Sequence, residues 1–247
     1  MERERGMKKT RIVIPREHGG WAMVSVPYFI GMVAAKPALL HLPLFLAWLF
    51  LYMASYPFLQ SLKTTAKRKT WISWGTVYAL VAAVFLVPVL VFKPSMLWFA
   101  PVLLVLIMVN VWHVLRKAER ALLNDISAIL LFCTGGAAAY MLGGGGFDQL
   151  LAAVVSLNFL YFTGTVFFVK SVFRERKNRR WTAYAIMYHS VMLILPIFFG
   201  HPWMCLPFLF PFVKTLRYAG KIMKPMKVGM IEIAGSIQFL LLSWILM

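Results

Sequence analysis

The feature that most limits how this chain can fold is a succession of long apolar segments separated by short basic connections. A helix needs roughly 20 mostly apolar residues to cross about 30 Å of hydrocarbon. Nine segments approach this length, the first and eighth of them short or interrupted by proline: residues 20–35, 39–60, 71–92, 95–115, 121–142, 148–171, 182–199, 202–218 and 229–247. The pattern predicts an all-α, polytopic bundle of about nine transmembrane helices.

The composition supports a membrane protein. Of the 247 residues, 61% are hydrophobic and 14% are charged, against about 45–50% and about 25% in average globular chains. We therefore expect a basic cytoplasmic segment over residues 1–19 and a single transmembrane helical domain over residues 20–247. The basic head and the apolar run after it resemble a signal peptide. No cleavage site leads into a soluble domain, however, so we expect a retained first helix.

Positive charge is confined to alternate connections. All 26 Lys and Arg residues except Lys36 and Lys93 lie before the first predicted helix or around the ends of the second, fourth, sixth and eighth. Because cytoplasmic loops carry the excess of Lys and Arg, the N-terminus is predicted to be inside and the C-terminus outside. This topology and the attraction of anionic lipids account for the net charge of +18, and no nucleic-acid partner is needed.

Four titratable residues at the predicted cytoplasmic face are candidate catalytic groups: Glu17, His18, Asp125 and Glu232. Charges inside or at the ends of apolar helices are costly and usually face a cavity or a partner. A His beside a Glu offers a proton-transfer pair, although both could form only the polar collar of the first helix. Asp125 could act in catalysis or only in capping and ion pairing. Glu232 needs a cationic partner such as Lys214, Arg217 or Lys170.

Basic and amide side chains at the same face are candidate ligands for a phosphate or carboxylate group. They are Arg16, Lys63, Arg116, Arg120, Asn124, Lys170, Arg174 and Arg217. Helical spacing would let Glu119 pair with Arg116 or Arg120 along one face, and would place Lys170 and Arg174 on one face of the sixth helix. The alternative for the cations is that they extend to lipid headgroups.

Other signals of chemistry are weak. The chain contains no GxSxG, HExxH, Walker or CxxC motif, and no metal site is expected. Cys133 and Cys205 lie in apolar runs and are expected to be inert packing residues. Asn158, His189 and Gln238 lie deeper in their predicted helices, where each could make a hydrogen bond between helices and all could line a small polar pocket.

Three stretches resemble the YwiC-like family of bacterial integral membrane proteins: "IPREHGGWAMVSVPYFIGM", "RKAERALLNDISA" and "KPMKVGMIEIAGS". The resemblance extends over essentially the whole chain, and the opening motif is its most specific part. It implies a multi-pass protein of the bacterial cytoplasmic (inner) membrane. That family is functionally uncharacterised, so the resemblance supplies no catalytic residues.

The expected architecture also resembles the UbiA-type prenyltransferase superfamily. Those enzymes hold a prenyl diphosphate through magnesium, which is bound by Asp-rich motifs in the loops after helices two and six. The corresponding stretches here read "SYPFLQSLKTTAKRK" and "VKSVFRERKN", with Glu175 as their only acid. A magnesium cofactor is therefore not expected, and Lys63, Lys170 and Arg174 could hold the diphosphate directly.

Three functions remain open for this sequence. A UbiA-like protein that binds a lipidic anion at the cytoplasmic face would gather Arg16–His18, Asp125, Lys170, Arg174 and Glu232 around one cavity. A proton-coupled transporter would use Glu232, Asp125 and His18 and would need a polar route to the outer face. A non-catalytic assembly factor for a membrane complex would leave the same residues scattered, each paired locally.

Overall fold

The computed structural model describes residues 12–15, 18–198 and 200–247, without the side chain of His18. These residues form nine α-helices and two short 3₁₀ helices, and no strand occurs among them. In chain order the elements are α1 (His18–Ala34), α2 (His41–Lys63), α3 (Arg68–Phe92), η1 (Pro94–Trp98), α4 (Phe99–Leu115), α5 (Leu122–Leu142), α6 (Gln149–Val172), α7 (Arg179–Phe198), η2 (Pro202–Cys205), α8 (Leu206–Tyr218) and α9 (Pro225–Leu246).

Each predicted apolar segment corresponds to one α-helix, and the boundaries differ by a few residues. The fourth and eighth segments each begin with a 3₁₀ turn, η1 and η2, in place of regular α-helix. Both turns start at a proline, Pro94 or Pro202, which lacks the backbone N–H of an interior helical residue. α8 is short, with 13 residues, and contains Pro207 in its first turn and Pro211 in its interior.

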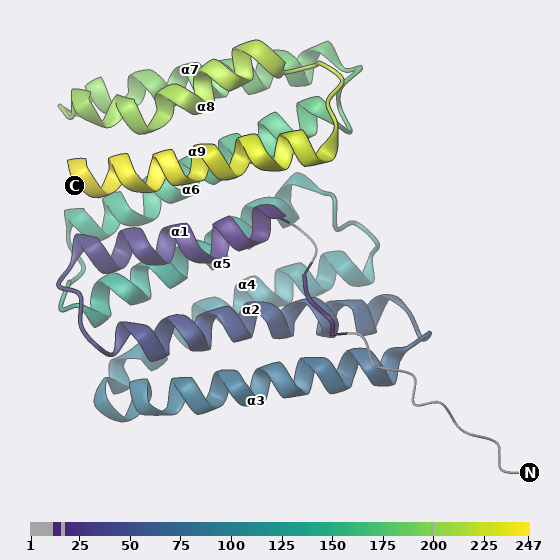
Figure 1. Ribbon diagram of the computed structural model, residues 1–247, viewed down its shortest axis with the longest axis vertical. Coiled ribbons are helices and arrows are strands. Elements are labelled where there is room, and N and C mark those ends of the chain that lie inside the picture. Colours follow the sequence, from purple (N-terminus) through teal and green to yellow (C-terminus); the bar gives the residue numbers. More distant parts are fainter. Residues whose placement is uncertain (1–11, 16–17, 199) are drawn as a thin grey trace, which may run out of the picture.

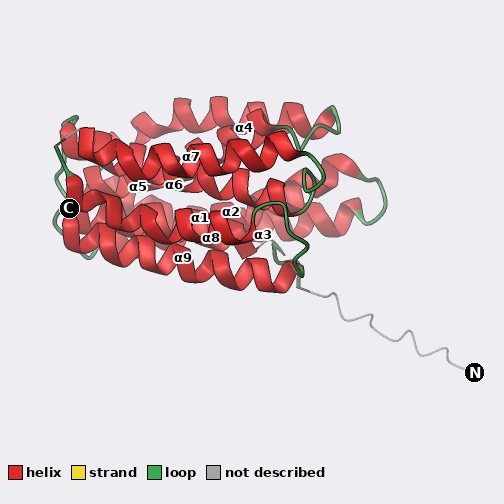
Figure 2. Cartoon of the chain, turned by 90° about the horizontal axis from the view of Figure 1, so that it is seen from above, coloured by secondary structure: helices red, strands yellow, loops and turns green. Residues whose placement is uncertain are grey.

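The helices run back and forth in two layers (Figure 1). One layer contains α8, α9, α1 and α2, the other contains α7, α6, α5 and α4, and α3 packs on the outside of α2. The α2–α3, α4–α5, α6–α7 and α8–α9 connections all lie at one end of the bundle, which we call the basic end. The α2–α3 hairpin reaches furthest there (Figures 1 and 2). Lys36 and Lys93 lie in connections at the opposite end.

Seven of the helices are long and apolar enough to cross a membrane, as expected of a multi-pass membrane protein. They are α2, α3, η1 with α4, α5, α6, α7 and α9. The surfaces of α3 and α4 support this environment, since large apolar side chains such as Leu80, Val84 and Leu104 are mostly exposed. Only lipid covers such a surface at no cost.

The two remaining helices are short. α1 has 17 residues and would span about 26 Å at 1.5 Å per residue. It nevertheless occupies the centre of the bundle, in contact with α2 and α9 in its own layer and with α5 and α6 in the other. A helix enclosed by longer neighbours does not itself have to match the full thickness of the hydrocarbon.

The backbones of α1 and α5 approach closely at two glycines. A Cβ atom on Gly31 would overlap the backbone oxygen of Gly136, and a Cβ atom on Gly136 would lie 2.5 Å from the backbone oxygen of Pro27. Gly135 similarly leaves room for the indole of Trp48 on α2. Small residues at a crossing let helices in a membrane pack through their backbones. The glycines of α1 and α5 thus bring the short central helix into close contact with its neighbours.

Replacing Gly31 or Gly136 with alanine should destabilise the bundle by about 1–3 kcal/mol, the usual cost of overpacking. Thermal unfolding of the purified protein in detergent measures the effect. Gly19→Ala is the matched control within α1, because a Cβ there would meet no atom of the described residues within 4 Å. Alanine at this helical position should be neutral or slightly stabilising. Equal unfolding temperatures for Gly31→Ala and Gly19→Ala would contradict the close crossing.

Candidate functional site

Three ion pairs join described residues, and all three include a cation predicted at the basic end. Each pair links two different parts of the bundle. Lys63 at the end of α2 pairs with Glu119 in the α4–α5 connection, Lys170 of α6 pairs with Asp125 of α5, and Lys214 of α8 pairs with Glu232 of α9. The four candidates in these pairs, Lys63, Asp125, Lys170 and Glu232, therefore link neighbouring parts of the bundle to one another.

The Lys63–Glu119 pair is the most exposed of the three, with side chains 29% and 35% exposed. The expected pairing of Glu119 with Arg116 or Arg120 is wrong. The reason is that α4 ends at Leu115 and residues 116–121 form turns, so helical spacing does not apply to them. Arg116 instead lies over the ring of Trp112, 4.4 Å from its centroid.

The Asp125–Lys170 pair is partly buried. Lys170 Nζ lies 2.8 Å from Asp125 Oδ2 and also donates to the backbone oxygen of Arg120 at 2.8 Å. The expectation that Arg174 shares a helical face with Lys170 is wrong, because α6 ends at Val172. Arg174 lies in the following turn, is exposed, and still places positive charge near Asp125.

The remaining candidate ligands are exposed or half-buried. Arg120 and Arg217 are exposed, and Arg217 lies 5.5 Å from the ring centroid of Tyr218. Asn124 is half-buried and donates through Nδ2 to the backbone oxygen of Glu119 at 2.8 Å. This bond ties the start of α5 to the turn that carries the Lys63 partner.

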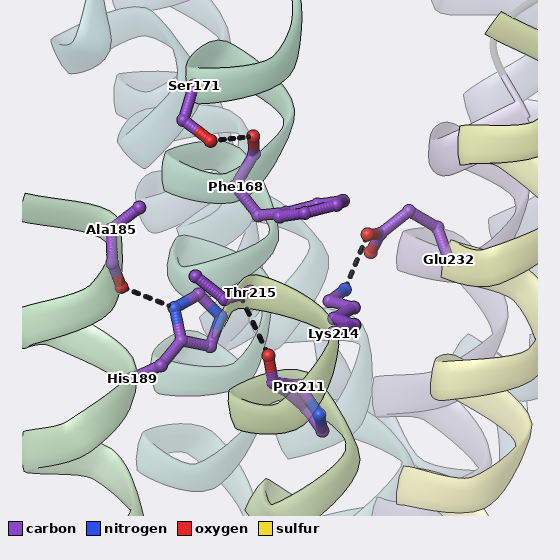
Figure 3. Close-up of polar contacts among 8 residues, drawn as sticks. All are labelled: Phe168, Ser171, Ala185, His189, Pro211, Lys214, Thr215 and Glu232. Atoms are coloured by element: carbon purple, nitrogen blue, oxygen red, sulfur yellow. Dashed lines mark hydrogen bonds and ion pairs between the residues drawn. The ribbon is translucent and has the colours of Figure 1, made fainter. Parts of the chain in front are cut away.

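The third ion pair is buried (Figure 3). Lys214 Nζ lies 2.5 Å from Glu232 Oε1, and the two side chains are only 3% and 9% exposed. The prediction that Glu232 needs a cationic partner is confirmed, and among the three candidates that partner is Lys214. The ring of Phe168 on α6 covers the ammonium group, with its centroid 4.8 Å from Nζ.

A narrow cleft adjoins this pair where α1, α6 and α9 meet. Its volume of about 10 Å³ is close to the least space that holds one water molecule. Glu232 Oε2 is buried and has no hydrogen-bond partner among the described residues. The residues that line the cleft are Gly19, Ala22, Met23, Phe162, Thr165, Gly229, Glu232, Ile233 and Ser236.

Each of the deeper polar residues bonds to backbone through one polar atom, and its second polar atom is buried without a partner among the described residues. Asn158 donates to Val154 O at 2.7 Å, and His189 Nδ1 lies 2.7 Å from Ala185 O, each within its own helix. Only Gln238 makes the expected bond between helices, from Nε2 to Leu206 O at the start of α8. None of the three lines the cleft beside Glu232.

The described candidates do not surround a single cavity. Asp125, Lys170 and Arg174 form one group around the α5–α6 end, and none of them lines the cleft that contains Glu232. Arg16 and Glu17 lie outside the described residues, as does the side chain of His18. The start of α1 is nevertheless beside Glu232, because Gly19 lines the same cleft.

Sequence reasoning missed Thr165, Ser236 and Phe168 as neighbours of the buried pair. Ser236 could have been found, since it lies four residues after Glu232 and so on the same helical face. Thr165 and Phe168 come from α6, and only the packing of α6 against α8 and α9 brings them to the pair.

A second hollow lies at the α2–α3 turn, where the chain reaches furthest at the basic end. It is open, has a volume of about 480 Å³, and is lined by Thr65, Lys67, Arg68, Lys69 and Ile72. Lys67 adopts a left-handed backbone conformation with φ of 62° just before α3. The three cations make no ion pair with any described residue.

The described residues do not suit a bound magnesium ion. Among them, no three His, Cys, Asp or Glu side chains lie close enough together to hold a metal. Glu175, the only acid in the two stretches compared with the UbiA type, accepts a hydrogen bond from Asn178 Nδ2 at 3.2 Å. Its neighbours in the chain, Arg174, Arg176 and Lys177, are all cationic.

The resemblance to the YwiC-like family is confirmed by comparison with known proteins. The family model described as "YwiC-like protein" matches residues 14–140. The "Uncharacterized protein YwiC" of Bacillus subtilis is 37% identical over 230 residues, which are 93% of this chain and 96% of that protein. An "Uncharacterized protein" of Haemophilus influenzae is 31% identical over 232 residues, or 94% of this chain and 97% of that protein. No solved structure matches the chain.

Replacing Lys214 alone with methionine should destabilise the protein by about 3–5 kcal/mol, because Glu232 would be left buried without its counter-charge. The double variant Lys214→Met/Glu232→Met should recover most of that loss. Lys63→Met is the control, since an exposed pair contributes at most about 1 kcal/mol. Unfolding in detergent tests all three variants, and a double variant as unstable as Lys214→Met would contradict the coupling.

Proposed function

The chain belongs to the YwiC-like family, and on that premise we propose that it binds a lipidic anion, such as a prenyl diphosphate, at the basic end of its helix bundle. The binding is direct, through Lys and Arg, with no bridging magnesium. The observation that carries the proposal is the hollow at the α2–α3 turn, where three cations adjoin an apolar side chain.

Charge and position favour this hollow over the cations proposed from the sequence. Lys63 and Lys170 each have a carboxylate partner that an incoming anion would have to displace. Lys67, Arg68 and Lys69 have no such competitor among the described residues. Charge-assisted hydrogen bonds to phosphate are about twice as strong as neutral ones.

The chemistry of the hollow suits a headgroup that remains attached to an apolar chain. Ile72 lies one turn into α3 on the side of the bilayer, and its side chain is 42% exposed. The basic residues precede it, towards the water. A phosphate or diphosphate would contact the cations, and the hydrocarbon chain would continue along the apolar surface of α3. The UbiA-type architecture and the prenyl nature of the chain are part of this proposal.

We further propose that all nine helices cross the cytoplasmic membrane of a bacterium, with the N-terminus and the basic end inside and the C-terminus outside. The clustering of the α2–α3, α4–α5, α6–α7 and α8–α9 connections at one end supports this orientation. In this arrangement the longer helices α2, α5, α6 and α9 surround the short helix α1 and separate it from the lipid. η2 and α8 together cover residues 202–218, as many residues as α1.

A proton-coupled transporter is the second candidate, and the buried Lys214–Glu232 pair is the observation that favours it. Ionisable groups inside a helix bundle often mark ion or proton pathways. The local pairing of Lys63 and Lys170 would also suit a non-catalytic assembly factor. Binding measurements separate these functions, because only the first requires affinity for a lipidic anion.

Replacing Lys67, Arg68 and Lys69 together with alanine should weaken lipidic-anion binding at least about tenfold, or about 1.4 kcal/mol. Native mass spectrometry of the purified protein with farnesyl diphosphate, phosphatidylglycerol or inorganic diphosphate measures this. Farnesyl diphosphate tests the proposed class of ligand, and phosphatidylglycerol tests general lipid binding. Inorganic diphosphate tests whether the headgroup alone is sufficient.

The matched control for that experiment replaces Lys221, Lys224 and Lys227, which are three exposed cations at the same end. This variant removes the same net charge from a different connection and should retain most of the affinity. Equal losses in the two triple variants would show only general attraction to positive charge. No affinity of the unaltered protein for any of the three compounds would refute the proposed function.

The orientation can be tested with two single cysteines at the ends of α3, in a Cys205→Ser background. Lys93→Cys should react with a membrane-impermeant thiol reagent in cells whose cytoplasmic membrane is intact. Lys69→Cys should react only after that membrane is permeabilised. Both lysines are exposed, so accessibility in the folded protein is matched. The reverse labelling pattern would overturn the proposed topology.

A further inference from the structure

Glu232 has one satisfied and one unsatisfied carboxylate oxygen. Oε1 accepts from Lys214, whereas Oε2 is buried and has no partner among the described residues. The whole residue is only 7% exposed. A buried acceptor without a partner costs about 1–3 kcal/mol, and more when it is charged. Such an atom beside a cleft indicates something that donates a hydrogen bond to it.

The cleft supplies the remaining contacts that this donor would need. Thr165 of α6 and Ser236 of α9 line it together with Glu232, so two residues with hydroxyl groups and one with a carboxylate border a space suited to about one water molecule. A buried water usually makes about three hydrogen bonds to polar groups. The start of α1 at Gly19 also lines the cleft, which places it towards the basic end.

We propose that this cleft is a proton-exchange site, in which one water molecule connects Glu232 Oε2 with the solvent at the basic end. A proton passes from solvent through the water to Oε2, and the carboxylate becomes a neutral carboxylic acid. Lys214 retains its three protons. The pair therefore changes from net neutral to a net charge of +1, and the reverse step returns the proton to the same side.

The charges around the cleft select a neutral occupant that carries protons. An anion would sit beside the Glu232 carboxylate and would meet a like charge in a poorly solvated place. A metal cation would leave three charged groups together, whereas a proton forms a bond to Oε2 and leaves one charge, that of Lys214. Protonation therefore carries the cost of a buried charge that has lost its partner. The ring of Phe168, 4.8 Å from Lys214 Nζ, stabilises the ammonium charge that remains when Glu232 is protonated.

The titratable groups nearest to Glu232 come from three helices. Lys214 on α8 is its direct partner. Tyr161 on α6 has a buried hydroxyl near Gly235, the neighbour of Ser236. His189 on α7 is on the far side of α8 from Glu232, beside Thr215 (Figure 3). The described residues of α1 that line the cleft, Gly19, Ala22 and Met23, carry no titratable side chain.

Aromatic side chains lie on the side of the cleft away from the basic end. Beyond Ser236, in the direction of the C-terminus, the rings of Tyr161 and Phe239 stack with centroids 4.0 Å apart. Both residues are at most 2% exposed. The two buried rings place apolar surface on the C-terminal side of Ser236, so we expect Glu232 to exchange protons with the basic end and not across the bundle. Protonation would weaken the link between α8 and α9.

Infrared difference spectra of the intact purified protein, taken between alkaline and acidic buffer, test the proposal. The unaltered protein should show a carboxylic-acid carbonyl band on acidification that shifts in heavy water. Glu232→Gln should lose this band, and Glu232→Asp should move it. Glu119→Gln is the matched control, because it alters the exposed pair and should retain the band. Glu232→Gln is first checked for a single size-exclusion peak and unaltered helical content.

Two further results decide the role of the cleft. Thr165→Val/Ser236→Ala removes both hydroxyls and should slow exchange of the Glu232 proton with heavy water at least about tenfold. Unchanged exchange in that variant would overturn the water-filled path. The other seven Asp and Glu side chains also protonate on acidification, so the decisive signal is the part of the band that Glu232→Gln loses. A Glu232→Gln spectrum that lacks no part of the band would overturn Glu232 as the proton-binding group. Neither outcome involves lipid binding, so the result is independent of the proposed function.

Discussion

The close crossing of α1 and α5 is the contact on which the rest of the bundle depends. In lipid, apolar surface alone does not drive helices together, so close packing and interhelical hydrogen bonds have to do so. Gly31 and Gly136 remove the side chains that would separate the two backbones. α1 is thereby held at the centre, where it contacts both layers. The same placement brings its first turn against α9, and so forms one wall of the cleft beside Glu232.

The three ion pairs all join a lysine to a carboxylate, but they differ in burial and therefore in their effect on stability. Lys63–Glu119 is exposed at the end of the bundle and contributes little stability. Lys170–Asp125 is partly buried and also fixes the backbone of the α4–α5 turn through Arg120. Lys214–Glu232 is nearly inaccessible. A buried ion pair is costly to form, and removing one partner is more costly still. Stabilisation of the bundle alone is therefore a poor explanation for this third pair.

Two different regions of the basic end therefore point to two different kinds of ligand. The α2–α3 turn presents uncompensated cations in an open hollow, as an anionic headgroup requires. The cleft at α1, α6 and α9 is small, enclosed and charge-balanced, which suits water and a proton. The first would recruit a lipid from the bilayer, and the second would report the proton concentration of the same compartment to the packing of α8 against α9.

The sequence by itself determined the helices and the accumulation of basic residues at one end, because apolar length and Lys/Arg alternation are properties of consecutive residues. It also indicated that Glu232 needs a cation. Local spacing failed at Glu119 and Arg174, where the helices end before those residues. Only the tertiary structure decided that Lys214 is the partner, that α1 is central, and that Thr165 faces Ser236. These pairings join residues far apart in the chain, and they follow from which helix faces meet in three dimensions.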